Sequence, residues 1–123
     1  MTIYAQGDIL IERVADANIT KARKPINVDP DGAVILARGE VTGHRHRFMG
    51  GDVTMFRDDG LASGVPTELY LGHIKIAAPT ADLVHEEHGT ITLPKGTYRA
   101  EVLDHGAHDR PIPIPDPVTI TVE

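Results

Sequence analysis

The sequence predicts an all-β fold, a small β-barrel or β-sandwich of the jelly-roll type with a proline-rich C-terminal arm. Short apolar and β-branched runs recur about every ten residues, which is the spacing of strands in such folds. The 12 glycines and 9 prolines among 123 residues supply the turns between these runs. No window of the sequence shows the apolar stripe of an amphipathic helix.

The N-terminal third is expected to contain two strands joined by a long loop. Residues 8–14 are an apolar and partly β-branched run that follows Gly7, which is typical of a strand. Residues 15–31 are polar and rich in turn residues. Asp29-Pro30-Asp31-Gly32 (residues 29–32) carries proline and glycine at turn-forming positions. Residues 33–37 (AVILA) then give the second strand.

The middle of the chain alternates between strands and glycine breaks. Residues 39–48 are expected to enter a strand that the Gly50-Gly51 pair ends. Residues 52–57 alternate between apolar and polar side chains, as in a strand with one face in water. Residues 68–78 predict one long strand with a bulge at Gly72, or two short strands.

Three more strands complete the expected domain. The first is residues 81–84, which follow Pro79 and lead into a histidine-rich segment. Residues 90–93 and 97–103 are expected to be the other two, joined by a tight turn at residues 94–96 (PKG).

The C-terminal arm, residues 110–123, is expected to stand apart from a single β domain formed by residues 1–109. Proline occupies every second position from 111 to 117, which removes backbone donors and keeps the chain extended. Residues 118–122 (VTITV) are a strong strand sequence that can pair with the edge of a sheet. That edge belongs either to the same domain or to a neighbouring subunit, so the arm also predicts a homo-oligomer or an assembly partner.

The composition argues against several classes of protein. A formal net charge of −6 is poorly suited to binding phosphate backbones, so nucleic acid is not an expected partner. Without cysteine there is no disulfide, thiolate nucleophile or thiolate metal site. Neither a signal peptide nor a membrane-spanning run is recognisable, and we expect a cytoplasmic or, for a phage component, virion-associated protein. The single serine, Ser63, lies outside any nucleophile-elbow motif.

Two pairs of histidines are the strongest chemical signal. His44 and His46 are two residues apart in an expected strand, so their side chains share one face while those of Arg45 and Arg47 take the other. Two imidazoles on one face of a strand are half of a typical metal site, which needs three or four converging ligands.

The second pair, His85 and His88, is three residues apart, with Glu86 and Glu87 between them. In an extended strand these histidines would face opposite ways, so both can reach one ion only if the chain turns there, and Gly89 favours such a turn. The candidate metal ligands are therefore His44, His46, His85 and His88, with either glutamate as a carboxylate ligand. The ion would be Zn²⁺, Fe²⁺, Mn²⁺ or Ni²⁺. The alternative is that these histidines are solvent-facing or hydrogen-bonded around a loop.

The order of these motifs resembles that of the cupin superfamily, small β-barrels with a metal ion in the mouth. The HxH pair at His44 and His46, followed by the Pro-x-Gly of residues 94–96, carries the resemblance. Gly50 stands near the place of the expected glutamate and Arg99 near that of the expected histidine, so His85 and His88 would have to replace two of the four cupin ligands.

The chain more closely resembles a group of small uncharacterised proteins of bacteria and their phages over much of residues 6–100. Four motifs carry this resemblance: residues 6–10 (QGDIL), 39–47 (GEVTGHRHR), 85–89 (HEEHG) and 93–99 (LPKGTYR). The group implies no activity, and its members commonly end in a charged tail in place of the proline-rich arm.

Two functional hypotheses follow. The first is a small β protein with a histidine-rich transition-metal site, in which the metal would act as a Lewis acid or redox centre if the protein is an enzyme. The second is a structural or assembly protein, for example a phage particle component, that uses the arm and its strand for subunit contacts. The sequence assigns no reaction and no substrate.

Overall fold

The computed structural model describes residues 2–15, 24–38, 44–49, 52–61, 64–102 and 118–121. Within these residues the regular structure is β-strand, apart from one short 3-10 helix, η2 (Asp59–Leu61). The prediction of an all-β fold is therefore confirmed. The strands are β1 (Thr2–Gln6), β2 (Ile9–Val14), β3 (Val34–Arg38), β4 (Arg45–Met49), β5 (Val53–Phe56), β6 (Tyr70–Val84), β7 (Ile91–Val102) and β8 (Val118–Thr121).

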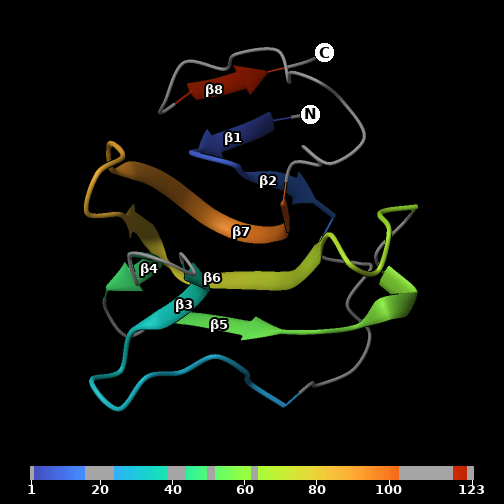
Figure 1. The fold of residues 1–123 in the computed structure, drawn as a ribbon, viewed down its shortest axis with the longest axis horizontal. Helices are drawn as coiled ribbons and strands as arrows, with labels where there is room; N and C mark the ends of the chain where they lie inside the picture. The colour runs from blue at the N-terminus through green and yellow to red at the C-terminus, as the bar shows by residue number, and fades with distance from the viewer. Residues whose placement is uncertain are drawn as a thin grey trace.

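All eight strands belong to one antiparallel sheet, in the order β3-β4-β6-β7-β2-β1-β8, with β5 beside β6 (Figure 1). β5 pairs with the first half of β6, where Met55 lies opposite Ile74. β4 pairs with the last residues of β6, where Phe48 lies opposite Leu83. Among the described strands β3 and β8 end the order and do not pair with each other. The fold is thus a curled open sheet rather than a closed barrel.

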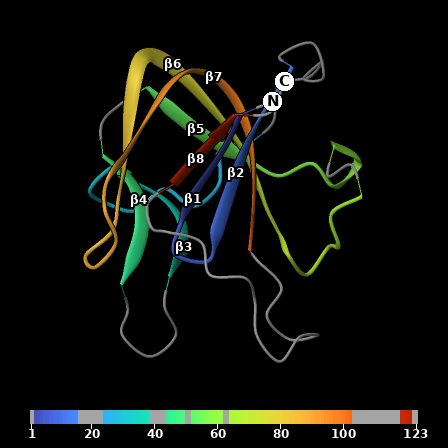
Figure 2. The same cartoon turned by 90° about the horizontal axis from the view of Figure 1, so that it is seen from above.

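The two longest strands, β6 and β7, pair along most of their length and arch together over the rest of the sheet (Figure 2). The sequence predicts breaks at Pro79 and at residues 94–96, but both strands run through these positions. The expected strand 68–78 and the expected strand 81–84 are one strand, and the predicted tight turn at residues 94–96 is wrong.

Pro79 is tolerated in β6 because the pairing shifts there. The register between β6 and β7 changes between Ile76 and Thr80, so Pro79 lies where the ladder of hydrogen bonds is already interrupted.

A side-chain hydrogen bond also ties the two halves of β7 together. The hydroxyl of Tyr98 donates to the carbonyl oxygen of Pro94 at 2.5 Å. Burial raises the pKa of Tyr98 to about 12, so this hydroxyl keeps its proton and its hydrogen bond.

The strand β1 was not predicted from the sequence. β1 forms a hairpin with β2 through Gly7 and Asp8, with Gln6 opposite Ile9. Gly7 has a φ of +60°, a conformation that glycine adopts at little cost in such a two-residue turn. β1 has only five residues and leads directly into the Gly7-Asp8 turn, so its sequence alone is a weak strand signal.

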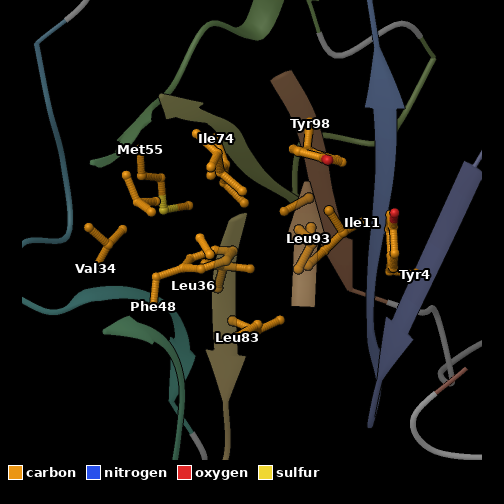
Figure 3. Close-up of a cluster of buried hydrophobic side chains, with 14 of the residues drawn as sticks. Tyr4, Ile11, Val34, Leu36, Phe48, Met55, Ile74, Leu83, Leu93 and Tyr98 are labelled. Atoms are coloured by element: carbon orange, nitrogen blue, oxygen red, sulfur yellow. The ribbon is translucent and has the colours of Figure 1, made fainter. Parts of the chain in front are cut away.

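The core is formed by inward-facing side chains from both halves of the curled sheet (Figure 3). Tyr4 and Tyr98 pack edge to face with their ring centroids 6.1 Å apart. Phe48, Leu83 and Leu93 are each 0% exposed, and this part of the core lies at the ends of β4, β6 and β7 that carry the candidate histidines. Most of the core is aliphatic.

The C-terminal strand β8 pairs antiparallel with β1, with Val118 opposite Ala5. The predicted boundary between residues 109 and 110 and the proline-rich segment lie outside the described residues, as do residues 39–43. No described helix is long and apolar enough to cross a membrane.

Gly72 should be the most sensitive glycine of the sheet. It has a φ of +150°, and a Cβ atom there would lie 2.8 Å from the carbonyl oxygen of Phe56 and 3.0 Å from the Met55 side chain. We expect Gly72→Ala to lower the free energy of unfolding by about 3 kcal/mol in a urea titration. Gly64→Ala is the control, because Gly64 has a φ of +86° with no atom within 4 Å, and should cost only about 1 kcal/mol. Equal losses would show that contact with β5 is irrelevant.

Candidate functional site

The structure brings together the four histidines that the sequence selects. The ring centroids of His46 and His85 are 4.3 Å apart, and those of His85 and His88 are 4.5 Å apart. The distances are 5.7 Å from His44 to His85 and 5.9 Å from His46 to His88. Two pairs that lie about 40 residues apart in the sequence thus form one cluster of imidazoles, the histidine cluster.

The spacing of the rings is close to that of a loaded metal site. Imidazoles that bind a tetrahedral ion at about 2 Å have ring centroids roughly 5 Å apart. In the described part of the chain, however, no three His, Cys, Asp or Glu side chains stand so that they could hold a metal ion.

Strand alternation in β4 gives His46 and its arginine neighbours their directions. His46 is 6% exposed and points inward with Phe48, whereas Arg45 and Arg47 are on the other face. The guanidinium of Arg45 is 2.8 Å from a carboxylate oxygen of Asp29. The predicted division of faces is confirmed for His46, Arg45 and Arg47, whereas His44 precedes the strand.

The segment from residue 85 to residue 88 is the turn that the sequence requires. Nδ1 of His85 accepts hydrogen bonds from the backbone N–H groups of Glu87, at 3.0 Å, and His88, at 3.2 Å. This capping closes a loop directly after β6 and brings both histidines to the same side. Burial lowers the pKa of His85, and a positive charge on His88 would lower it further.

The two glutamates of the loop have different partners. Glu86 accepts a hydrogen bond from the backbone N–H of Arg45 at 2.9 Å and pairs with the Arg47 guanidinium at 2.6 Å. Desolvation would raise the pKa of Glu86, but these hydrogen bonds outweigh it and the pKa lies below its ordinary value. A carboxylate oxygen of Glu87 is 3.1 Å from Nδ1 of His44, so Glu87 meets the cluster through that histidine.

Gln6 is the residue that sequence reasoning missed. It is 0% exposed, and its side-chain nitrogen donates to the carbonyl oxygens of Leu83, at 2.9 Å, and Gly89, at 2.8 Å. Its side-chain oxygen is 2.8 Å from Nδ1 of His46. One amide thus links the β1–β2 hairpin, both ends of the histidine loop and His46. The QGDIL motif was visible in the sequence, but nothing local indicated that its glutamine is buried.

Gly7 forms the surface against which two of the rings pack. A Cβ atom on Gly7 would lie 2.8 Å from Nε2 of His88 and 3.3 Å from Cε1 of His46. Glycine is therefore required both by the positive φ and by the close approach of the imidazoles.

The remaining histidines do not join the cluster among the described residues. His73 is 2% exposed, and its Nδ1 is 2.6 Å from the hydroxyl of Tyr70, which contacts the backbone of Asp58. Burial lowers the pKa of His73, as does the charge of Arg99, so it is a neutral structural residue. His105 and His108 lie outside the described residues.

Replacing Gln6 should weaken the fold as well as the cluster. Gln6→Met keeps the length of the side chain but leaves two buried carbonyl oxygens and the His46 ring without this partner. We expect the free energy of unfolding to fall by about 3 kcal/mol, measured by urea denaturation. A loss below about 1 kcal/mol would mean that water replaces the amide and that Gln6 does not hold the loop.

Comparison with known proteins gives a family but no activity. A search of curated proteins and a search of solved structures found no match. The model of a domain of unknown function, DUF8820, matches residues 5–102, which begin just before Gln6 and end with β7. The expectation of a small uncharacterised family is thus confirmed, and the chain belongs to the DUF8820 domain family.

Proposed function

We propose that this protein binds one transition-metal ion in the histidine cluster formed by His44, His46, His85 and His88. The observation that carries the proposal is the convergence of the two histidine pairs, from the start of β4 and the loop after β6. Four imidazoles are an unusual set to gather unless an ion holds them, because they repel one another when protonated.

The hydrogen bonds around the cluster also favour a metal ion. Histidine ligands usually donate their second ring N–H to a carboxylate or a carbonyl oxygen, which fixes the tautomer and orients the ring. The side-chain oxygen of Gln6 stands in this relation to His46, and the Glu87 carboxylate does so to His44. In both histidines this leaves the lone pair on Nε2, the atom that would bind the ion.

The donor set limits the choice of ion. Imidazole ligands suit Zn²⁺, Fe²⁺, Mn²⁺ and Ni²⁺, and the chain has no cysteine to select a softer metal. A cupin-like centre that binds a substrate at an open position is the catalytic form of the proposal.

Metal analysis tests the proposal directly. Purified without a histidine tag, the chain should contain close to one equivalent of a transition metal, and chelation should lower its thermal midpoint. His46→Ala should lose the ion. Lys75→Gln is the control, because Lys75 is an exposed residue of β6, ten positions before His85, and the variant should keep the ion.

Two results would contradict metal binding. One is a full-length chain that takes up no Zn²⁺, Fe²⁺, Mn²⁺ or Ni²⁺ and is equally stable in chelator. The other is a metal content that falls no more in His46→Ala than in Lys75→Gln.

A second candidate function is subunit assembly through the C-terminal arm, as in a phage particle component. It is supported by the pairing of β8 with β1 at the end of the sheet and by a family match that ends before the arm. A strand at a sheet edge that follows a proline-rich segment is suited to exchange between copies, because its pairing needs only backbone groups.

Removing the arm tests assembly. The full-length chain should be an oligomer in solution, and deletion of residues 110–123 should reduce it to a monomer, measured by light scattering after size exclusion. The curled sheet should keep its far-ultraviolet circular dichroism, since β1 through β7 form the core. A mass that is unchanged by the deletion would argue against the arm as an assembly element.

A further inference from the structure

His73 is a buried imidazole that the proposed metal site does not use. It lies on β6 with 2% of its surface exposed, and its partners in the two neighbouring strands are Phe56 of β5 and Arg99 of β7. Its ring stacks on that of Phe56, with centroids 5.6 Å apart and 21° between the planes. An imidazole enclosed in this way can take up a proton only at the cost of burying a charge.

The Tyr70 hydroxyl connects this imidazole to the turn that forms η2. The hydroxyl oxygen is 2.6 Å from Nδ1 of His73 and 3.2 Å from both the backbone nitrogen and the carbonyl oxygen of Asp58. Because 2.6 Å is shorter than the usual N–H···O hydrogen bond, the hydroxyl is the donor and Nδ1 is the acceptor. The same hydroxyl oxygen accepts the backbone N–H of Asp58. Neutral His73 thus orients Tyr70, and Tyr70 holds the start of the turn.

Asp58 is the residue on which the η2 turn, residues 58–61, is built. Its carbonyl oxygen accepts the N–H of Leu61 at 2.9 Å, and its carboxylate accepts the N–H of Gly60 at 3.0 Å. The preceding residue, Arg57, donates to the carbonyl oxygen of Tyr70 at 2.8 Å and so keeps the chain attached to β6 just before the turn. A shift of Asp58 away from the Tyr70 hydroxyl would therefore move the η2 turn as a unit.

We infer that the η2 turn is an acid-sensitive switch, in which protonation of His73 displaces the Tyr70 hydroxyl and releases residues 58–61 from β6. The inference goes beyond the proposed metal site and does not depend on it. A proton on Nδ1 turns this atom from an acceptor into a donor, so the hydroxyl can no longer donate to it. Moving the turn also lets water reach the charged ring, whereas β5 and β7 are held in place by their pairing with β6.

The charges around His73 determine the direction of the switch. Arg99 faces it from β7 and is paired with Glu12, Lys75 is two residues further along β6, and Asp58 is the negative group on the side of the turn. Burial and the charge of Arg99 lower the pKa of His73, and together they outweigh the attraction of Asp58. A histidine whose pKa is lowered by folding stabilises the folded form above its ordinary pKa of 6.5. That contribution is lost as the pH falls below this value, so acid should open the turn.

Hydrogen exchange of the Leu61 amide tests the switch, because this N–H is protected only while the turn is closed. After correction for intrinsic exchange, its protection factor in the unmodified chain should fall at least about fivefold between about pH 7.5 and about pH 5, a range in which aspartate stays ionised. In His73→Asn the side-chain oxygen can accept from Tyr70 in place of Nδ1 but does not titrate, so the change should stay below about twofold. Tyr70→Phe removes the hydroxyl, and Leu61 should exchange rapidly at both pH values.

Two further measurements on the unmodified chain complete the test. The amide of Ile35, which donates to the carbonyl oxygen of Asn27 at 2.9 Å, is the reference for the rest of the sheet and should keep its protection. The ¹⁵N shifts of His73 should report a lone pair on Nδ1 at neutral pH and a pKa below 6.5.

Three results would overturn the switch. The first is a protection factor at Leu61 that falls as much in His73→Asn as in the unmodified chain. The second is an equal fall at Ile35, which would mean that acid weakens the sheet as a whole. The third is a proton on Nδ1 of His73 at neutral pH, because the Tyr70 hydroxyl would then have nothing to lose when the ring becomes charged.

Discussion

The antiparallel pairing of β6 with β7 is the constraint on which the rest of the sheet depends. β6 gives one edge to β7 and divides the other between β5 and β4. A straight strand of its 15 residues would extend roughly 50 Å, too far for its two ends to share a core. The register shift between Ile76 and Thr80 lets the hairpin bend, so Ile74 from the first half and Leu83 from the second join one apolar cluster.

The site depends on a buried amide in the same way. Gln6 is fully buried, so its three polar contacts are costly to lose and it holds Leu83, Gly89 and His46 at fixed positions. Because two of these contacts orient the amide, the third sets the tautomer of His46. A structural hydrogen-bond network therefore also determines the chemistry of a histidine at the cluster.

Much of the fold and of the histidine cluster could be predicted from the sequence, and the features that were predicted wrongly or not at all have physical explanations. The period of two in residues 44–48 was enough to predict the faces of His46 and Arg47, because strand alternation is local. The breaks expected at Pro79 and at residues 94–96 were wrong because one register shift, between Ile76 and Thr80, takes up Pro79 opposite residues 94–96, and such an irregularity depends on the partner strand. Gln6 was missed for the same reason: its side chain bonds to Leu83 at the end of β6, 77 residues away, which no local pattern reports.

Both faces of β4 serve the same site. The inner face contributes His46 to the cluster, and on the outer face Arg47 and the backbone N–H of Arg45 bind Glu86. Glu86 belongs to the loop that carries His85 and His88, so the arginines hold that loop against the strand that carries the other histidine pair. The ion pair is partly exposed and adds little to the stability of the whole fold. Its effect is to order the loop, so in the proposed metal site the histidines would already be positioned and would lose less entropy on binding an ion. In this alternation of histidine and arginine, one face of the strand contributes His46 to the cluster and the other face fixes the loop that carries His85 and His88.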